Sequence, residues 1–198
     1  MLECINAVGN CGFRVTTLSS DLDRRNTSLW NSLGIYVSTN GEVNNSFVHN
    51  GHEIYTQPDP CHIIKNLRSA MLRQVLYLCP NYVEHNDLPT NEVRGSYVEK
   101  LWQHEISCES EERLLHHLER KYLYPNTFQA MNVGGALQFF SPITASALKT
   151  AVQNKILPKE ALTTAHFIGL MHEYFSLMLS QLRKTSFILR NFDRKYIF

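Results

Sequence analysis

Two short stretches of the chain contain the residues whose types and spacing could do chemistry. In the first, Asp21 follows the run Phe13–Ser20, whose β-branched and aromatic residues are typical of a strand. A carboxylate at the end of a strand is a hard oxygen ligand of the kind that Mg²⁺ accepts in two-metal phosphoryl-transfer sites. An aspartate in this position is also a common turn residue or helix cap. Asp21 by itself therefore leaves both interpretations open.

The second stretch runs from Asp59 to Arg68 and predicts the start of a helix. Asp59 is placed to cap this helix, and Pro60 suits its first position. Asp59 and His62 are then one turn apart at a helix N-terminus, where phosphate-linked or metal-linked chemistry is favoured. The alternative is an ordinary capped helix whose basic side is solvated.

The same helix is predicted to have an apolar stripe opposite a basic side. The stripe is formed by Ile64, Leu67, Met71, Val75 and Leu78. Lys65 and Arg68 are expected on the other side, and no acidic residue occurs between Asp59 and Glu84 to neutralise them. Both cations are therefore expected to face solvent.

The elements around these residues predict a short α/β beginning. Leu2–Asn10 has the apolar spacing of a helix, and Thr27–Leu33 predicts a second short helix closed by Gly34. The runs Ser46–His49 and His52–Thr56 flank an Asn-Gly pair, which is the strongest short signal for a β-hairpin. This order of elements indicates an α/β layer with Asp21 at the carboxyl end of a strand.

From about residue 96 the pattern becomes helical. Ser110–Glu119 predicts one helix, and Ser141 followed by Pro142 predicts the cap of a helix over Ile143–Val152. A third helix is expected to run from Pro158 to about Leu182 and to be buried around most of its circumference. Residues 183–198 form a basic tail with five basic residues and one acid.

Composition excludes several classes of protein. The 198 residues contain 19 Lys plus Arg and 18 Asp plus Glu, so a binder acting through bulk positive charge is excluded. The longest charge-free stretch, residues 122–148, is broken by proline and glycine and predicts no membrane span. Five cysteines without Cys-x-x-Cys spacing indicate reduced thiols of an intracellular protein. Phosphate-loop, dinucleotide-binding, zincin and nucleophile-elbow motifs are absent.

Several segments together resemble a known family. These segments are Leu2–Val8, Gly12–Val15, Ser20-Asp21 with Asn26, Leu33–Ile35, Ile54–Arg68, Gln138–Leu148 and Thr164–Ile168. In this order they resemble the P-element/THAP-domain family of DNA transposases, over roughly residues 2 to 178. The most specific piece is the Asp-x-x-His-x-x-Lys-x-x-Arg pattern that begins at Asp59.

The resemblance implies an RNase H-like nuclease core interrupted by a helical GTP-binding insertion. Residues 1–80 would be a partial, incomplete RNase H-like α/β core, and residues 81–182 a mostly α-helical insertion. Residues 183–198 match no part of the family. The resemblance also implies a nuclear protein that binds transposon-end DNA, and it leaves a homo-oligomer open.

In such enzymes three carboxylates hold two Mg²⁺ ions that activate water or a 3′-hydroxyl for attack on DNA phosphate. By its order along the chain, Asp21 corresponds to the second of these catalytic, metal-binding carboxylates. Asp59 and His62 belong to the motif that leads into the insertion, with no assigned role. Lys65 and Arg68 would contact the DNA backbone, and GTP would bind the insertion.

The chain also departs from the family pattern. The first and last catalytic carboxylates and the DNA-binding zinc domain have no counterpart, and Asp23 replaces a usual glycine. Gly134 and Gly135 stand where relatives carry basic residues. We therefore expect a truncated or domesticated transposase that cleaves no DNA alone and binds GTP weakly or not at all.

Three alternatives stay open. The chain could be a working enzyme completed by another segment or subunit. It could instead be a non-enzymatic nucleotide-binding or oligomerisation module derived from a transposase. An unrelated α/β-plus-helical domain is the last alternative.

Overall fold

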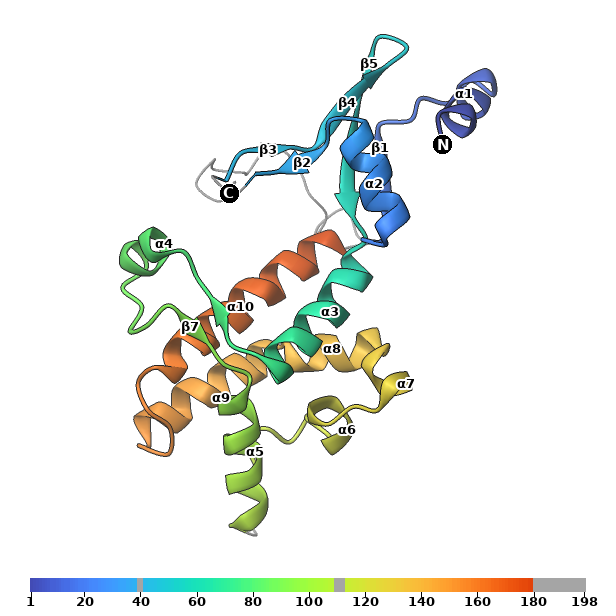
Figure 1. The fold of residues 1–198 in the computed structure, drawn as a ribbon. Helices are drawn as coiled ribbons and strands as arrows, with labels where there is room; N and C mark the ends of the chain where they lie inside the picture. The colour runs from blue at the N-terminus through green and yellow to red at the C-terminus, as the bar shows by residue number, and fades with distance from the viewer. Residues whose placement is uncertain (39–40, 109–112, 180–198) are drawn as a thin grey trace. The chain divides into compact units, whose positions relative to one another are not determined.

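The computed structural model describes residues 1–38, 41–108 and 113–179. It divides into two compact units, the first formed by Met1–His62 and the second beginning at Ile63 (Figure 1). The basic tail predicted over residues 183–198 lies outside the described residues. None of the helices in the described part of the chain has the length and apolar composition of a membrane span.

The first unit is built on a three-stranded sheet. Strand β1 (Thr17–Ser20) pairs in parallel with β5 (His52–Pro58), and β5 pairs antiparallel with β4 (Ser46–His49), so the order is β1-β5-β4. Asn50 and Gly51 connect β4 to β5 with φ angles of 50° and 74°. Positive φ at both positions matches the turn that an Asn-Gly pair favours, which confirms the predicted hairpin.

Two helices complete most of this unit. Helix α1 (Leu2–Asn10) has the predicted bounds. Helix α2 (Arg24–Ser32) begins three residues before the predicted start, because the Asp23 side chain accepts a hydrogen bond from the backbone N–H of Arg25. The residue that departs from the family pattern is therefore the cap of this helix.

The core of the first unit is small. Its buried apolar residues are Ile5, Ile35, Phe47 and Ile54. Four partly exposed apolar residues pack against them: Val15, Leu18, Trp30 and Leu33. A second pair of strands, β2 (Tyr36–Val37) and β3 (Val43–Asn44), is antiparallel. Both strands of this pair are only two residues long, so they add little to the core.

The second unit is mostly helical. Its elements are the greater part of α3 (Pro60–Arg73), β6 (Leu76–Tyr77), α4 (Pro80–His85), β7 (Glu92–Val93), α5 (Ser96–Ser107), α6 (Arg120–Leu123), α7 (Thr127–Ala130), α8 (Val133–Phe139), α9 (Pro142–Gln153) and α10 (Ala161–Met178). The predicted helices behind Ser141-Pro142 and Pro158 are confirmed as α9 and α10, which pack against each other. Twenty-two buried residues of this unit form one apolar cluster among the described residues.

Two predicted helices differ in the structure. Helix α3 ends at Arg73 and does not reach Leu78, because β6 pairs antiparallel with β7. Of the helix predicted over Ser110–Glu119, residues 114–117 form a turn, residues 113, 118 and 119 are irregular, and residues 109–112 lie outside the described part. The carboxylate of Glu105 accepts the backbone N–H groups of Leu114 and Leu115 at 2.9 and 3.1 Å, and this satisfies them without a helix.

The fold class is confirmed at the level of a mixed α/β protein with small sheets and many helices. The compact units divide after His62, whereas the sequence pattern places a domain boundary near residue 80. The reason is that Ile64 and Met71 of α3 are buried in the large apolar cluster of the second unit. The domain roles and the RNase H-like architecture stay predictions.

Candidate functional site

Asp21 and Asp59 follow the two parallel strands of the first unit. The register places Ser20 of β1 beside Pro58 of β5, and the backbone N–H of Asp59 donates to the carbonyl oxygen of Ser20 at 2.7 Å. Parallel strands end at the same edge of a sheet, where ligand sites of α/β folds are common. The structure therefore brings together two acids that are 38 positions apart in the sequence.

The carboxylate of Asp21 is held by its own loop and by α2. Its Oδ1 atom accepts hydrogen bonds from the side-chain amide of Asn26 at 2.7 Å and from the backbone N–H of Asp23 at 3.2 Å. The Asn26 hydrogen bond, then the Asp23 backbone and the charge of His62 lower the pKa of Asp21 below its ordinary value. Asp21 is therefore an anion at neutral pH.

Asp59 both caps α3 and orients His62. Its Oδ1 atom accepts the backbone N–H of Cys61 at 2.9 Å, and its Oδ2 atom lies 3.0 Å from Nδ1 of His62. A carboxylate oxygen can only accept, so Nδ1 of His62 carries the hydrogen of this bond. In the neutral form of this tautomer the lone pair is on Nε2, the arrangement of a histidine that ligates a metal or accepts a proton.

These residues do not form a magnesium site by themselves. Within the described ranges, no group of three or more His, Cys, Asp or Glu side chains is placed to hold a metal ion. One oxygen of Asp21 and both oxygens of Asp59 are already engaged in hydrogen bonds. The metal-binding role of Asp21 therefore stays a prediction that needs further carboxylates, as do the unassigned roles of Asp59 and His62.

The two cations of α3 have different environments. Lys65 is partly exposed, as expected for a solvated position. Arg68 is fully buried, and its Nη2 group donates to the carbonyl oxygens of Gln129 and Ala130, each at 2.9 Å. The expectation that Arg68 faces solvent is therefore wrong, and its guanidinium is not exposed to meet a DNA phosphate.

The period of the helix explains the burial of Arg68. Positions 64, 68 and 71 follow the i, i+4, i+7 spacing, so Arg68 lies on the face that also buries Ile64 and Met71. Burial lowers the pKa of the Arg68 guanidinium. Its Nε and Nη1 atoms are buried without a hydrogen-bond partner. Arg68 is therefore a buried structural cation whose hydrogen-bonding capacity is only partly used.

His117 forms a polar network that the sequence did not reveal. Nε2 of His117 lies 3.0 Å from Ser141 Oγ and 2.9 Å from Thr144 Oγ1. Burial and the neighbouring His116 lower the pKa of His117. Since Ser141 also caps α9 through the backbone N–H of Thr144, His117 supports the start of that helix.

The second unit has a small cavity whose volume can be compared with that of a nucleotide. It has a volume of about 170 Å³ and is lined by residues 71–75 and 94–96. Ligand pockets usually have volumes of roughly 300–1,000 Å³, so this cavity does not accommodate a whole nucleotide. This cavity therefore does not identify the residues that would hold GTP.

Comparison with known proteins gives a family and a fold. Residues 61–187 match the family described as "TNP-like, GTP-binding insertion domain", so the match includes residues 183–187 of the tail that was expected to lie outside the family. A solved structure titled "Drosophila P element transposase strand transfer complex" matches with a TM-score of 0.73 and 22% identity, over 96% of this chain. This chain spans 40% of the length of that protein. No curated protein sequence matches.

Proposed function

The chain belongs to the family of TNP-like, GTP-binding insertion domains, and from this premise we propose that it is part of a P-element-like DNA transposase. The observation that carries the proposal is the extent of the structural match. It covers 96% of the chain and so includes most of the first unit, which lies outside the family match over residues 61–187. The proposed chemistry is metal-dependent phosphoryl transfer on DNA in the nucleus.

Asp21 is the residue that we propose takes part in this chemistry. In the proposed RNase H-like core it is one ligand of a Mg²⁺ site whose other carboxylates come from another segment or subunit. Strand β1 supports this role, because within the described residues it pairs only with β5 and its other edge is open. A strand added at that edge would end beside Asp21 and could contribute a second acid.

The isolated chain is proposed to be inactive as a nuclease, because one carboxylate does not organise a two-metal site. The first test is nicking of supercoiled DNA with Mg²⁺ or Mn²⁺, in which this chain should produce no product. Metal-dependent nicking that Asp21→Ala abolishes would overturn the proposed inactivity.

The second test uses a longer protein that supplies the remaining carboxylates. There Asp21→Asn should abolish cleavage, while Asp23→Asn, which changes the neighbouring helix cap, should retain it. Cleavage that survives Asp21→Asn would exclude the proposed role of this residue.

Lys65 is the remaining candidate on α3 for a DNA backbone contact. In the longer protein, Lys65→Ala should weaken DNA binding and reduce its salt dependence, because each neutralised phosphate adds to the slope of log K against log salt. An unchanged slope would remove Lys65 from the proposed DNA surface. Transposon-end DNA is the proposed partner of the longer protein.

A second candidate function is a non-enzymatic nucleotide-binding or oligomerisation module. It is favoured by the position of the family match, since residues 61–187 coincide with the unit that has the larger core. We expect GTP binding to be weak or absent, because Gly134 and Gly135 replace basic residues of the family pattern. Titration with fluorescent GTP decides between the two functions: micromolar, guanine-selective affinity would favour the module.

A further inference from the structure

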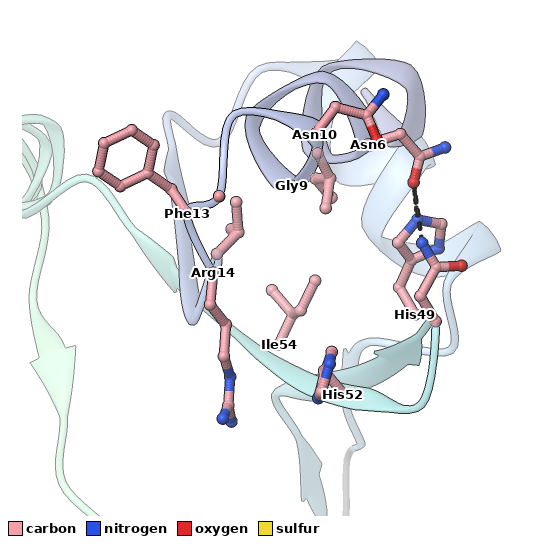
Figure 2. A pocket seen from close by; sticks show the side chains of 12 residues that line it. Asn6, Gly9, Asn10, Phe13, Arg14, His49, His52 and Ile54 are labelled. Carbon is pink, nitrogen blue, oxygen red and sulfur yellow. Dashed lines mark hydrogen bonds between the residues drawn. The ribbon is translucent and has the colours of Figure 1, made fainter.

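The first unit contains an open cavity of about 650 Å³, which Figure 2 shows from close by. Its walls are the C-terminal half of α1, the segment Gly12–Val15 and the tip of the β4–β5 hairpin. His52 and Ile54 are near the beginning of β5, whereas Asp59 follows its end. The cavity is therefore at the opposite end of the sheet from the candidate site.

The lining of this cavity is cationic and amidic. Its polar side chains are Arg14, His49, His52, Asn6, Asn10 and Asn50, and no Asp or Glu is among the lining residues. Ile5 and Ile54 contribute an apolar floor, and Figure 2 shows the Ile54 side chain between the walls. Such a lining offers hydrogen-bond donors and positive charge to an anionic group while also tolerating an apolar surface.

Two of the walls are tied together by hydrogen bonds. Oδ1 of Asn6 on α1 lies 2.8 Å from Nε2 of His49 and accepts from the side-chain amide of Asn50 at 3.0 Å (Figure 2). An amide oxygen can only accept, so His49 donates through Nε2. Two walls of the cavity, helix α1 and the hairpin tip, are thereby joined by side-chain hydrogen bonds.

Phe13 is among the residues that line the cavity, and its ring points outward, away from the other lining side chains (Figure 2). Phe13 is 71% exposed and is followed directly by Arg14, which is also exposed. A solvent-exposed aromatic face beside cationic groups is the arrangement on which proteins stack the bases of single strands while binding their phosphates. A duplex does not offer such a base face, because its bases are stacked on one another.

We propose that this cavity binds single-stranded DNA, with one base stacked on the outward face of Phe13 and the adjoining phosphate held by Arg14 and His52. The inference rests on the proposed function, in which the protein acts on DNA, and it assigns the single strand to the first unit. GTP is assigned elsewhere, because the cavity lies outside the family match over residues 61–187.

The test measures binding of a fluorescein-labelled single-stranded oligonucleotide to the full chain by anisotropy, over a range of salt concentrations. Phe13→Ala should weaken binding about 10-fold, since loss of a base–aromatic stack has an effect of this order. Arg14→Ala should weaken binding and reduce the magnitude of the salt slope by about 0.7, the value for one phosphate of a single strand.

Matched controls make these changes specific. Phe128→Ala removes an exposed phenylalanine of the second unit, and Arg24→Ala removes an exposed arginine of the first unit that does not line the cavity. Both controls should bind like the unchanged chain. Circular dichroism melting of each variant checks that the fold is retained.

The outcomes separate the alternatives. Equal losses in Phe13→Ala and Phe128→Ala, equal losses in Arg14→Ala and Arg24→Ala, no binding, or preference for duplex over single strand would each overturn the proposal. Inorganic phosphate and GTP should compete only at millimolar concentrations, and full competition by micromolar GTP would assign a nucleotide to the cavity instead. Failure here leaves the Asp21 cleavage test of the longer protein unaffected, so the two proposals fail separately.

Discussion

The two units of the chain differ most in how they are stabilised. The second unit buries 22 residues in one apolar cluster among the described residues, whereas the first buries four under a three-stranded sheet with an open edge. Apolar burial is the main favourable term in folding, at about 25 cal/mol per Å². The second unit therefore has the larger core, and we expect the first unit to be the less stable of the two.

The comparison also bears on function. The candidate site and the cavity of Figure 2 are both in the less stabilised unit, and the family match lies almost entirely in the better stabilised one. Elements that bind and move are drawn from regions of low local stability.

The largest expected effect is the separation of two unfolding transitions. The chain has two tryptophans, Trp30 in the first unit and Trp102 in the second. In a Trp102→Phe variant the fluorescence of Trp30 should report unfolding at a lower urea concentration than Trp102 reports in a Trp30→Phe variant. Coincident midpoints would mean that the two units unfold together, and the expected difference in their stability would be excluded.

Removing a large side chain from the second core should have the next largest effect. Phe140 is fully buried, and its ring centroid lies 5.2 Å from that of Phe139 and 6.4 Å from that of Phe175. Phe140→Ala should lower the unfolding free energy reported by Trp102 by about 3–5 kcal/mol. Phe128→Ala, at a position that is 86% exposed, should change it by less than about 0.5 kcal/mol. Similar losses in both would contradict the described core.

The two cations of α3 should differ in their effect on stability. Arg68→Ala leaves a cavity and removes the donor of two carbonyl oxygens, so we expect a loss of about 2–3 kcal/mol in the Trp102 transition. Lys65→Ala should change it by less than about 0.5 kcal/mol. If the two variants behave alike in urea unfolding, the assignment of Arg68 to the core is wrong.

Two glycines of the second unit provide a matched pair. A Cβ atom at Gly135 would lie 2.6 Å from Cδ1 of Tyr122 and 2.9 Å from Nη1 of Arg68, so Gly135→Ala should destabilise the unit by about 1–3 kcal/mol. A Cβ atom at Gly169 in α10 meets nothing within 4 Å, so Gly169→Ala should stabilise the unit by up to about 1 kcal/mol. Thermal melting measures both, and the same sign in the two variants would exclude this packing.

The smallest expected effect is a difference in pH dependence. Burial lowers the pKa of His117 and of His166 below 6.5, so the unfolded chain binds more protons near neutral pH. The second unit should therefore lose stability as the pH falls below about 6.5, and His117→Gln should reduce that loss. In the first unit, hydrogen bonds lower the pKa of Asp21 and Glu53, so its corresponding loss should begin only below about pH 5. Urea unfolding at pH 7.5, 5.5 and 4, followed with the two tryptophan reporters, measures the pH dependence of both units. If the stability reported by Trp102 does not change with pH, the buried histidines do not contribute as expected.

Local chemistry made several elements predictable from the sequence. The hairpin follows from the need for positive φ at Asn50 and Gly51, and α9 follows from the cap of Ser141 before Pro142. The position of Asp21 at a strand end and of Asp59 at a helix N-terminus was also predicted correctly. Each of these features depends on residues within a few positions of one another.

The errors arose where a distant partner decides the outcome. Helix α3 stops early because β6 pairs with β7, and the guanidinium on the buried face of α3 is held by carbonyl oxygens some 60 positions away, which accept the hydrogen bonds of Arg68. Glu105 likewise holds Leu114 and Leu115 in a turn. None of these partners could be identified from local spacing.

By itself, the sequence determined where most helices and strands form and which residues could do chemistry, because capping, turn geometry and apolar period are local properties. Only the tertiary structure decided that Asp21 meets the start of α3, that Arg68 is a core residue, and that α1 and the hairpin enclose a cationic cavity. The physical reason is that burial and hydrogen bonding between distant segments depend on how the chain packs, and a linear pattern does not specify those partners.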